Sequence, residues 1–142
     1  MTDIYIRICG ALIALRALTN FGKLFQGDDA VIVVFGQILR GGAAILPSLL
    51  IGAFMLATGV ALLRGARSAL PLIAIYAVYV AINLVTWTAS NPEELQRVGS
   101  IVSSATDAAT LQRDGAWAFV AYCVVALGTT AVPAWLLWRR RA

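Results

Sequence analysis

Apolar side chains occupy four long stretches of the chain, and shorter polar segments separate them. The stretches cover approximately residues 4–25, 43–63, 70–88 and 116–138. At a rise of ~1.5 Å per residue, a helix over each stretch is long enough to cross a hydrocarbon layer of ~30 Å. The pattern therefore predicts an all-α integral membrane protein with a four-transmembrane-helix bundle, formed as one domain by residues 1–142.

The two longer connections, residues 26–42 and 89–115, lie at the same end of the predicted bundle. Within the first, residues 30–39 are apolar but too few to span a membrane, so they predict a short helix that either lies at the interface or dips into it. Within the second, Asn91 and Pro92 are typical of a helix start, and an amphipathic pattern follows them. We expect a second interfacial helix there, and we expect Asp114 to cap the fourth span.

Basic residues gather at the opposite end of the predicted helices. Arg7 lies near the start of the first span, Arg64 and Arg67 flank the turn between the second and third, and the chain ends in Arg139–Arg141. By the positive-inside rule, this distribution predicts that both termini and the middle turn are cytoplasmic. Arginine outnumbers lysine ten to one, which indicates a GC-rich bacterial genome and hence the bacterial inner membrane. Charges at helix ends, rather than on one solvated face, argue against a nucleic-acid partner.

Composition supports the bilayer as the main partner and limits the chemistry. Hydrophobic residues make up 61% of the chain, against ~45–50% in soluble domains. The sequence has no histidine, and none of its seven carboxylates falls inside a predicted span. These absences argue against an imidazole metal ligand, a Ser-His triad and a membrane-embedded acid, so we expect no metal and no cofactor, and they weigh against an enzyme. Cys9 and Cys123 lie at different depths and are expected to be free, buried thiols.

A polar face on the first span is the strongest candidate for a binding site. Arg16, Asn20 and Lys23 follow at i, i+4 and i+7, which places them on one helical face. Arg16 lies ~18 Å from the inner end of its helix, where a charge costs ~2.5–3.5 kcal/mol unless it faces protein or water. Polar or basic side chains at or above this depth are Asn83, Thr86, Tyr122 and, near the mouth, Arg40. Together they predict an outward-facing basic pocket without an acid, which suits an anionic lipid or a small organic acid.

The same residues also admit a purely structural interpretation. Arg16 can donate to helix carbonyls and to Asn83, or it can fold toward the acidic pair at 28–29. Buried polar groups in small bundles often serve only to fix packing. Tyr76 and Tyr79 share a face with Asn83 on the third span, and for these two rings the sequence favours packing.

Small residues indicate where helices can approach closely. Gly10 and Ala14 lie on the first span, and Ala53, Ala57 and Ala61 repeat every four residues on the second. They favour a non-catalytic accessory or interaction subunit, which docks on a larger membrane complex or on a second copy of itself. The alternative is a binding protein or carrier for an anionic lipid or small organic acid through the outward-facing pocket. The small size of the chain and its lack of reactive groups favour the first role.

Parts of the first half of the chain resemble a known family. The segment GALIALRALTNFGKLF, followed by a short apolar stretch and by LATGVALLRG, is similar to the DoxX-like group of small four-helix bacterial membrane proteins. The shared features are a first helix ending in Gly22, Lys23, Leu24 and Phe25, and a second helix leading from Gly59 into a basic turn with Arg64 and Arg67. The resemblance implies the four-helix fold. An acid common in the second helix of that family has no counterpart here, so no activity is transferred.

Overall fold

The computed structural model describes residues 2–66, 68–90, 92–104 and 106–140. Its helices are α1 (Thr2–Gly22), α2 (Gly42–Arg64), α3 (Ala69–Ser90), α4 (Pro92–Val102) and α5 (Ala108–Arg139). In this described part of the chain, α1 with the 3-10 turn that follows it (Lys23–Phe25), α2, α3 and α5 are each long and apolar enough to cross a membrane. The four predicted apolar helices are therefore confirmed, and α5 extends well beyond its predicted start.

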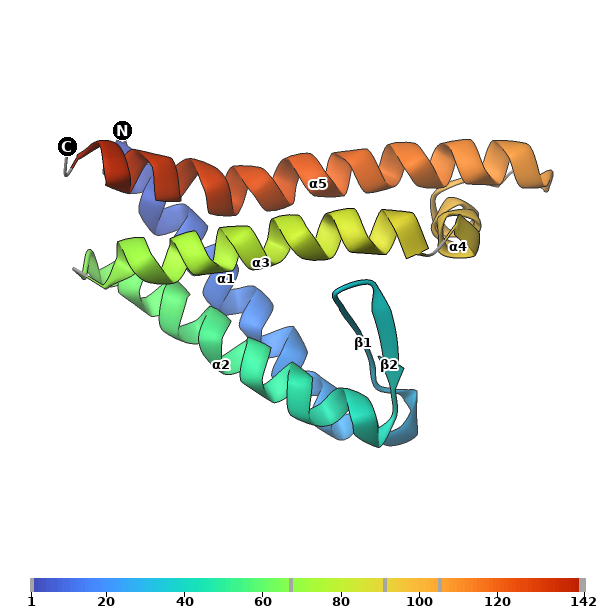
Figure 1. Cartoon of the computed structure of the whole chain (residues 1–142), viewed down its shortest axis with the longest axis horizontal. Helices are drawn as coiled ribbons and strands as arrows, with labels where there is room; N and C mark the ends of the chain where they lie inside the picture. Colours follow the sequence, from blue (N-terminus) through green and yellow to red (C-terminus); the bar gives the residue numbers. More distant parts are fainter. Residues whose placement is uncertain (1, 67, 91, 105, 141–142) are drawn as a thin grey trace.

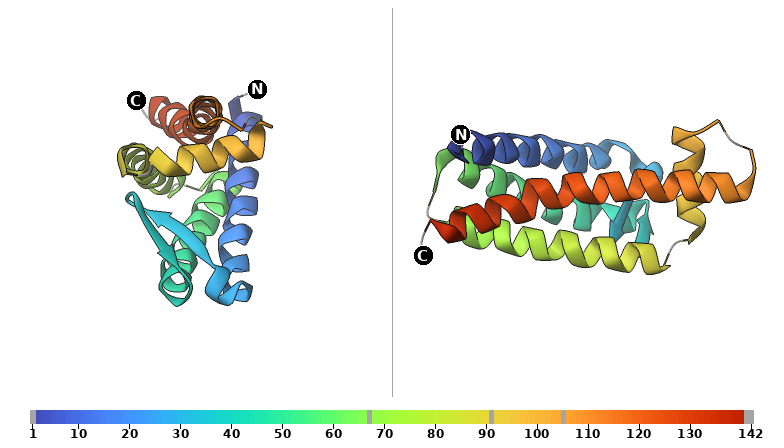
Figure 2. Two further views of the ribbon diagram at one scale, coloured as in Figure 1. Left: turned by 90° about the vertical axis from the view of Figure 1, so that its right-hand side faces the viewer. Right: turned by 90° about the horizontal axis from the view of Figure 1, so that it is seen from above.

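The long helices form two pairs that diverge like the arms of a V (Figure 1). One arm contains α1 and α2, and the other contains α3 and α5. The arms meet where α1 begins, α5 ends and the turn between α2 and α3 lies, which we call the termini end; they separate toward the end that carries a hairpin and α4, which we call the hairpin end (Figures 1 and 2). Buried apolar side chains fill the join between the arms; they include Ile13, Ala17, Met55, Leu62 and Ile73.

Close contact between α1 and α2 depends on two glycines. A Cβ atom added at Gly59 would lie 2.7 Å from the carbonyl oxygen of Gly10 and 2.8 Å from the Cβ atom of Ala14. The predicted small-residue surface of the first span, and buried Ala61 on the second, therefore belong to packing within the bundle. Ala53 and Ala57 are exposed on another side of α2 and take no part in that packing.

The first connection is a β-hairpin, so the predicted short helix over residues 30–39 is wrong. Strands β1 (Val31–Val34) and β2 (Gln37–Arg40) pair antiparallel, with Val31 opposite Arg40 and Val34 opposite Gln37. The strand VIVV is β-branched throughout, which favours a pleated strand over a helix. Phe35 and Gly36 both have positive φ, at 49° and 79°. A two-residue turn of this kind matches the twist of a hairpin.

The second connection contains a helix, α4, as predicted. Its place at the membrane interface stays a prediction. Asn91, its predicted cap, lies outside the described residues. The predicted cap of the fourth span is wrong, because Asp114 lies inside α5 and the helix begins earlier. The cap is Asp107, whose carboxylate accepts a hydrogen bond from the backbone N–H of Thr110 at 2.8 Å. Hydrogen bonds from Thr110 also lower the pKa of the Asp107 carboxyl below its usual value.

Helix α4 packs directly on the first turns of α5. A Cβ atom at Gly99 would lie 1.9 Å from the carbonyl oxygen of Leu111, and one at Gly115 would lie 1.7 Å from that of Leu95. Only glycine permits such an approach of the two backbones. The structure thereby fixes α4 across the hairpin end (Figure 2).

Arg7, Arg64 and Arg139 belong to the helix ends that meet at the termini end. Arg140 forms an ion pair with Asp3, which ties the end of α5 to the start of α1; Arg67 and Arg141 lie outside the described residues. Both cysteines are free as predicted; Cys9 is buried, whereas Cys123 is only half-buried.

Candidate functional site

A cavity of about 470 Å³ lies between the diverging arms, toward the hairpin end. Its volume falls within the ~300–1,000 Å³ typical of small-molecule pockets. Its polar lining consists of Arg16, Thr19, Asn20, Lys23, Tyr76, Tyr79, Asn83 and Tyr122. Its apolar lining consists of Ile32, Val33, Ile51, Met55, Val80, Leu84, Val98 and Phe119. All four long helices, the hairpin and α4 thus contribute to one site.

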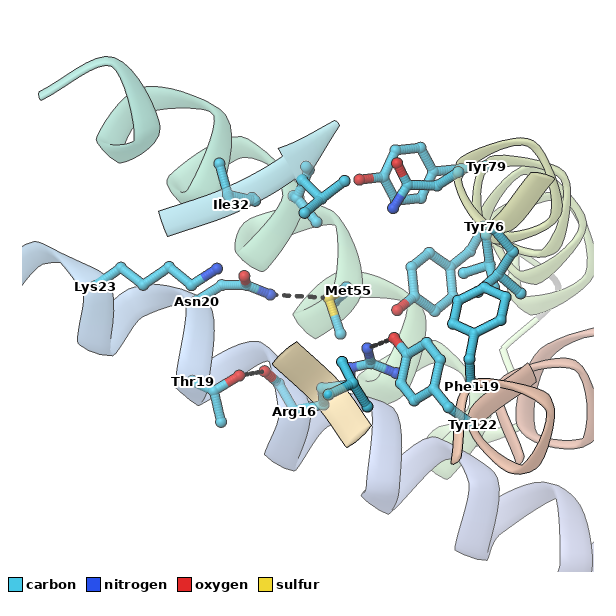
Figure 3. Close-up of a pocket in the computed structure, with 16 residues that line it drawn as sticks. Arg16, Thr19, Asn20, Lys23, Ile32, Met55, Tyr76, Tyr79, Phe119 and Tyr122 are labelled. Atoms are coloured by element: carbon cyan, nitrogen blue, oxygen red, sulfur yellow. Dashed lines mark hydrogen bonds between the residues drawn. The ribbon is translucent and has the colours of Figure 1, made fainter. Parts of the chain in front are cut away.

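Arg16 lies on the α1 wall of the cavity and reaches α5 (Figure 3). One guanidinium N–H donates to the hydroxyl oxygen of Tyr122, and the guanidinium carbon lies 5.1 Å from the centre of that ring. The structural partners that the sequence suggested, Asn83 and the acidic pair at 28–29, are not used. A guanidinium has five N–H donors, so this contact leaves most of them for another acceptor.

Asn20 and Lys23 continue the same wall, as their helical spacing predicts (Figure 3). The amide of Asn20 donates to the sulfur of Met55 at 3.2 Å, and a thioether is a weak acceptor. Within the described residues, the ammonium group of Lys23 has neither a hydrogen bond nor an ion pair. No carboxylate occurs among the described residues that line the cavity. Among the described residues, the cavity therefore carries two cations and no countercharge.

The facing wall, on α3, is aromatic and holds the hairpin in place. The rings of Tyr76 and Tyr79 stack with centroids 6.3 Å apart, and Phe35 at the hairpin tip meets Tyr79 edge-on at 5.7 Å. The carbonyl oxygen of the Asn83 side chain accepts a hydrogen bond from the backbone N–H of Phe35 at 2.7 Å. The two tyrosines pack, as the sequence favoured, and they also line the cavity.

Replacing Asn83 by leucine is expected to loosen the hairpin tip. The Phe35 N–H would lose its acceptor, and a hydrogen bond of this kind contributes about 1 kcal/mol, so amide exchange in the turn should accelerate by roughly fivefold. Hydrogen–deuterium exchange with peptides covering residues 31–40 measures this. Thr86→Val is the matched control, because the Thr86 hydroxyl donates to the carbonyls of Ile82 and Asn83 in its own helix. Unchanged exchange in the Asn83 variant would show that this contact does not hold the turn.

Two predicted site residues do not line the cavity. Thr86 donates to the carbonyl of Ile82 at 2.8 Å, and Arg40 is exposed on β2. The other five predicted residues, Arg16, Asn20, Lys23, Asn83 and Tyr122, all line it.

Several lining residues were missed by the sequence. Tyr76 and Tyr79 carried a usable signal, because they share a helical face with Asn83. Ile32 and Val33 carried none, because their place depends on a hairpin that apolar length alone did not suggest.

No family model, no curated protein and no solved structure matches this chain. The DoxX-like resemblance therefore stays a prediction.

Proposed function

We propose that the chain is a multi-pass integral membrane protein of the bacterial inner membrane, with both termini cytoplasmic. Four apolar helices of sufficient length support insertion, and the arginines at the termini end support the orientation by the positive-inside rule. The ten-to-one excess of arginine over lysine supports the bacterial source. In this orientation the cavity lies in the outer half of the bundle.

We further propose that the cavity binds an anion and that the protein acts as its receptor or carrier. The observation that carries this proposal is the pair of cations, Arg16 and Lys23, in a lining whose described residues include no carboxylate. A cation held within the hydrocarbon depth costs ~2.5–3.5 kcal/mol, which an anionic ligand would offset. Arg16 offers the planar fork that pairs with carboxylate or phosphate, and Lys23 adds a point charge.

The rest of the lining suits an amphipathic anion. Asn20 and the tyrosine hydroxyls are neutral hydrogen-bonding groups that can fix its orientation. Ile51, Val80 and Leu84 offer apolar surface within the same cavity. A few placed polar groups among apolar side chains are the usual composition of a binding pocket.

Native mass spectrometry of the protein, purified from its own membranes into neutral-lipid nanodiscs, tests this proposal. We expect a bound anionic species that survives purification and exchanges with added carboxylate or phosphate compounds. Protein that carries only the nanodisc lipid, and that binds none of the added anions, would refute the anion site.

A second candidate function, an accessory subunit, rests on the exposed small residues of α2. Ala53 and Ala57 lie on the outside of the bundle, beside exposed Leu50. A flat small-residue surface lets another membrane helix approach closely. Ala57→Leu is expected to abolish association with a partner or second copy, which cross-linking in native membranes measures. The variant should still bind anions. Equal cross-linking of the variant and of the unaltered protein would remove this candidate.

A further inference from the structure

A second, smaller cavity of about 190 Å³ adjoins the first. The two share Arg16, Tyr76 and Val80 as lining residues, so Arg16 lies at their junction. The smaller cavity extends from this junction toward the termini end, since Leu12 precedes Arg16 by one turn of α1 and Val125 follows Tyr122 by about one turn of α5. An apolar cavity of about 150 Å³ is already large enough to bind benzene.

The wall of the smaller cavity is apolar apart from its junction with the first. Leu12, Ile13, Val125 and Ala126 contribute hydrocarbon. Thr129 and Thr130 also line it, but their hydroxyls donate to carbonyls of α5 itself, Thr130 to Ala126 at 2.7 Å and Thr129 to Val125 at 2.9 Å. Both hydroxyls therefore already donate a hydrogen bond within α5.

The smaller cavity opens on the side of the bundle, between α1 and α5. Leu12 is 48% exposed and Val125 is 63% exposed, so its rim lies on the outer surface of the protein. Two hydrogen bonds join α1 to α5 near this opening. Arg16 donates to Tyr122 toward the hairpin end, and Tyr5 donates to the carbonyl of Gly128 at 2.6 Å toward the termini end. The opening is thus a lateral window between α1 and α5.

From this geometry, and resting on the proposed anion site, we infer that the ligand is an anionic lipid. Its headgroup lies in the larger cavity against Arg16 and Lys23, and one alkyl chain leaves through the window between α1 and α5 into the hydrocarbon. The path from the larger to the smaller cavity runs from the hairpin end toward the termini end. In the proposed orientation this is the direction of a chain of an outer-leaflet lipid, which points from the membrane surface toward the midplane. A free organic acid would use only the larger cavity and would leave the window without an occupant.

Photo-crosslinking in neutral-lipid nanodiscs tests the inference, with palmitate that carries a diazirine at mid-chain as the probe. We expect adducts on residues 12–13 and 125–130, displaced by unlabelled palmitate but not by hexadecanol or by butyrate at the same concentration. Leu12→Trp should lower the adduct yield by roughly tenfold, because excluding two methylenes from an apolar site already has that effect. Leu15→Trp is the matched control, because Leu15 is 63% exposed and lines neither cavity.

Thr129→Leu fills the same window from α5 and gives an independent test if Leu12→Trp does not fold. Butyrate that displaces the probe as well as palmitate does, or adducts spread evenly along the apolar surface, would overturn the lipid while leaving the anion site intact. Binding of none of these carboxylates, or binding unaffected by Arg16→Gln, would overturn the anion site as well.

Discussion

Replacing Gly59 by valine is expected to keep α1 and α2 from closing against each other. The added Cβ atom would meet the carbonyl oxygen of Gly10 at 2.7 Å and the backbone nitrogen of Ala14 at 2.8 Å. These are backbone atoms of a facing helix, so no side-chain rotation relieves the contact and the helices must separate. Overpacking of this kind costs about 1–3 kcal/mol. Thermal unfolding in detergent, followed by circular dichroism, should show a lower midpoint and a loss of folded protein.

Gly22→Ala is the control for this prediction. A Cβ atom at Gly22 meets nothing within 4 Å, and alanine is the better helix former, so this variant should be as stable as the unaltered chain or slightly more stable. Equal midpoints for the Gly59 and Gly22 variants would show that the close contact of α1 with α2 does not stabilise the fold. Because α1 carries Arg16 and Asn20, and Lys23 directly follows it, a displaced α1 should also lose anion binding.

The sequence predicted the elements that depend on one-dimensional patterns. Hydrophobic length identified the four long helices, because a helix that crosses ~30 Å of hydrocarbon needs about 20 apolar residues wherever it lies. Helical spacing likewise placed Arg16, Asn20 and Lys23 on one face, and the structure turns that face toward the cavity. Both properties belong to a single helix, so neither requires knowledge of its neighbours.

The errors concern elements whose form depends on local backbone chemistry or on a neighbour. The apolar character of residues 31–34 is compatible with either a helix or a strand. The hairpin follows instead from their β-branched side chains and from the positive φ of Phe35. Helix α5 begins at Ala108 because α4 packs against its first turns through Gly99 and Gly115. This packing involves another helix, so the length of an apolar stretch does not reveal it.

The partner of Arg16 shows the same limit at the site. Tyr122 is 106 residues away in the sequence, and the pair forms because the assembled bundle brings this part of α5 within reach of the Arg16 side chain. The sequence placed both residues at a similar depth, but it could not tell which helices are neighbours. The divergence of the two arms, which creates the cavity, is likewise a property of the assembled bundle.

Replacing Arg16 by glutamine is expected to abolish most anion binding and to leave the fold intact. Hydrogen bonds to a charged group contribute about 1.5–3 kcal/mol, so affinity for palmitate or another carboxylate should fall by roughly 10- to 100-fold. Microscale thermophoresis in nanodiscs measures this loss. Arg7→Gln removes a cation from the same helix outside the cavity and should retain affinity. Arg16→Lys keeps the charge but loses the planar fork of the guanidinium. Its affinity for the anion should lie between that of Arg16→Gln and that of Arg7→Gln.

Stability separates a binding role of Arg16 from a structural one. Within the described residues, the one hydrogen bond that the Arg16 side chain forms is with Tyr122, and a cation at this depth costs ~2.5–3.5 kcal/mol on insertion. If Arg16 serves the ligand, Arg16→Gln without ligand should unfold at the same temperature as the unaltered protein or higher, and added palmitate should stabilise only the unaltered protein. If Arg16 instead serves packing, Arg16→Gln should unfold at a lower temperature and bind the anion with unchanged affinity. That result would refute an anion site at Arg16.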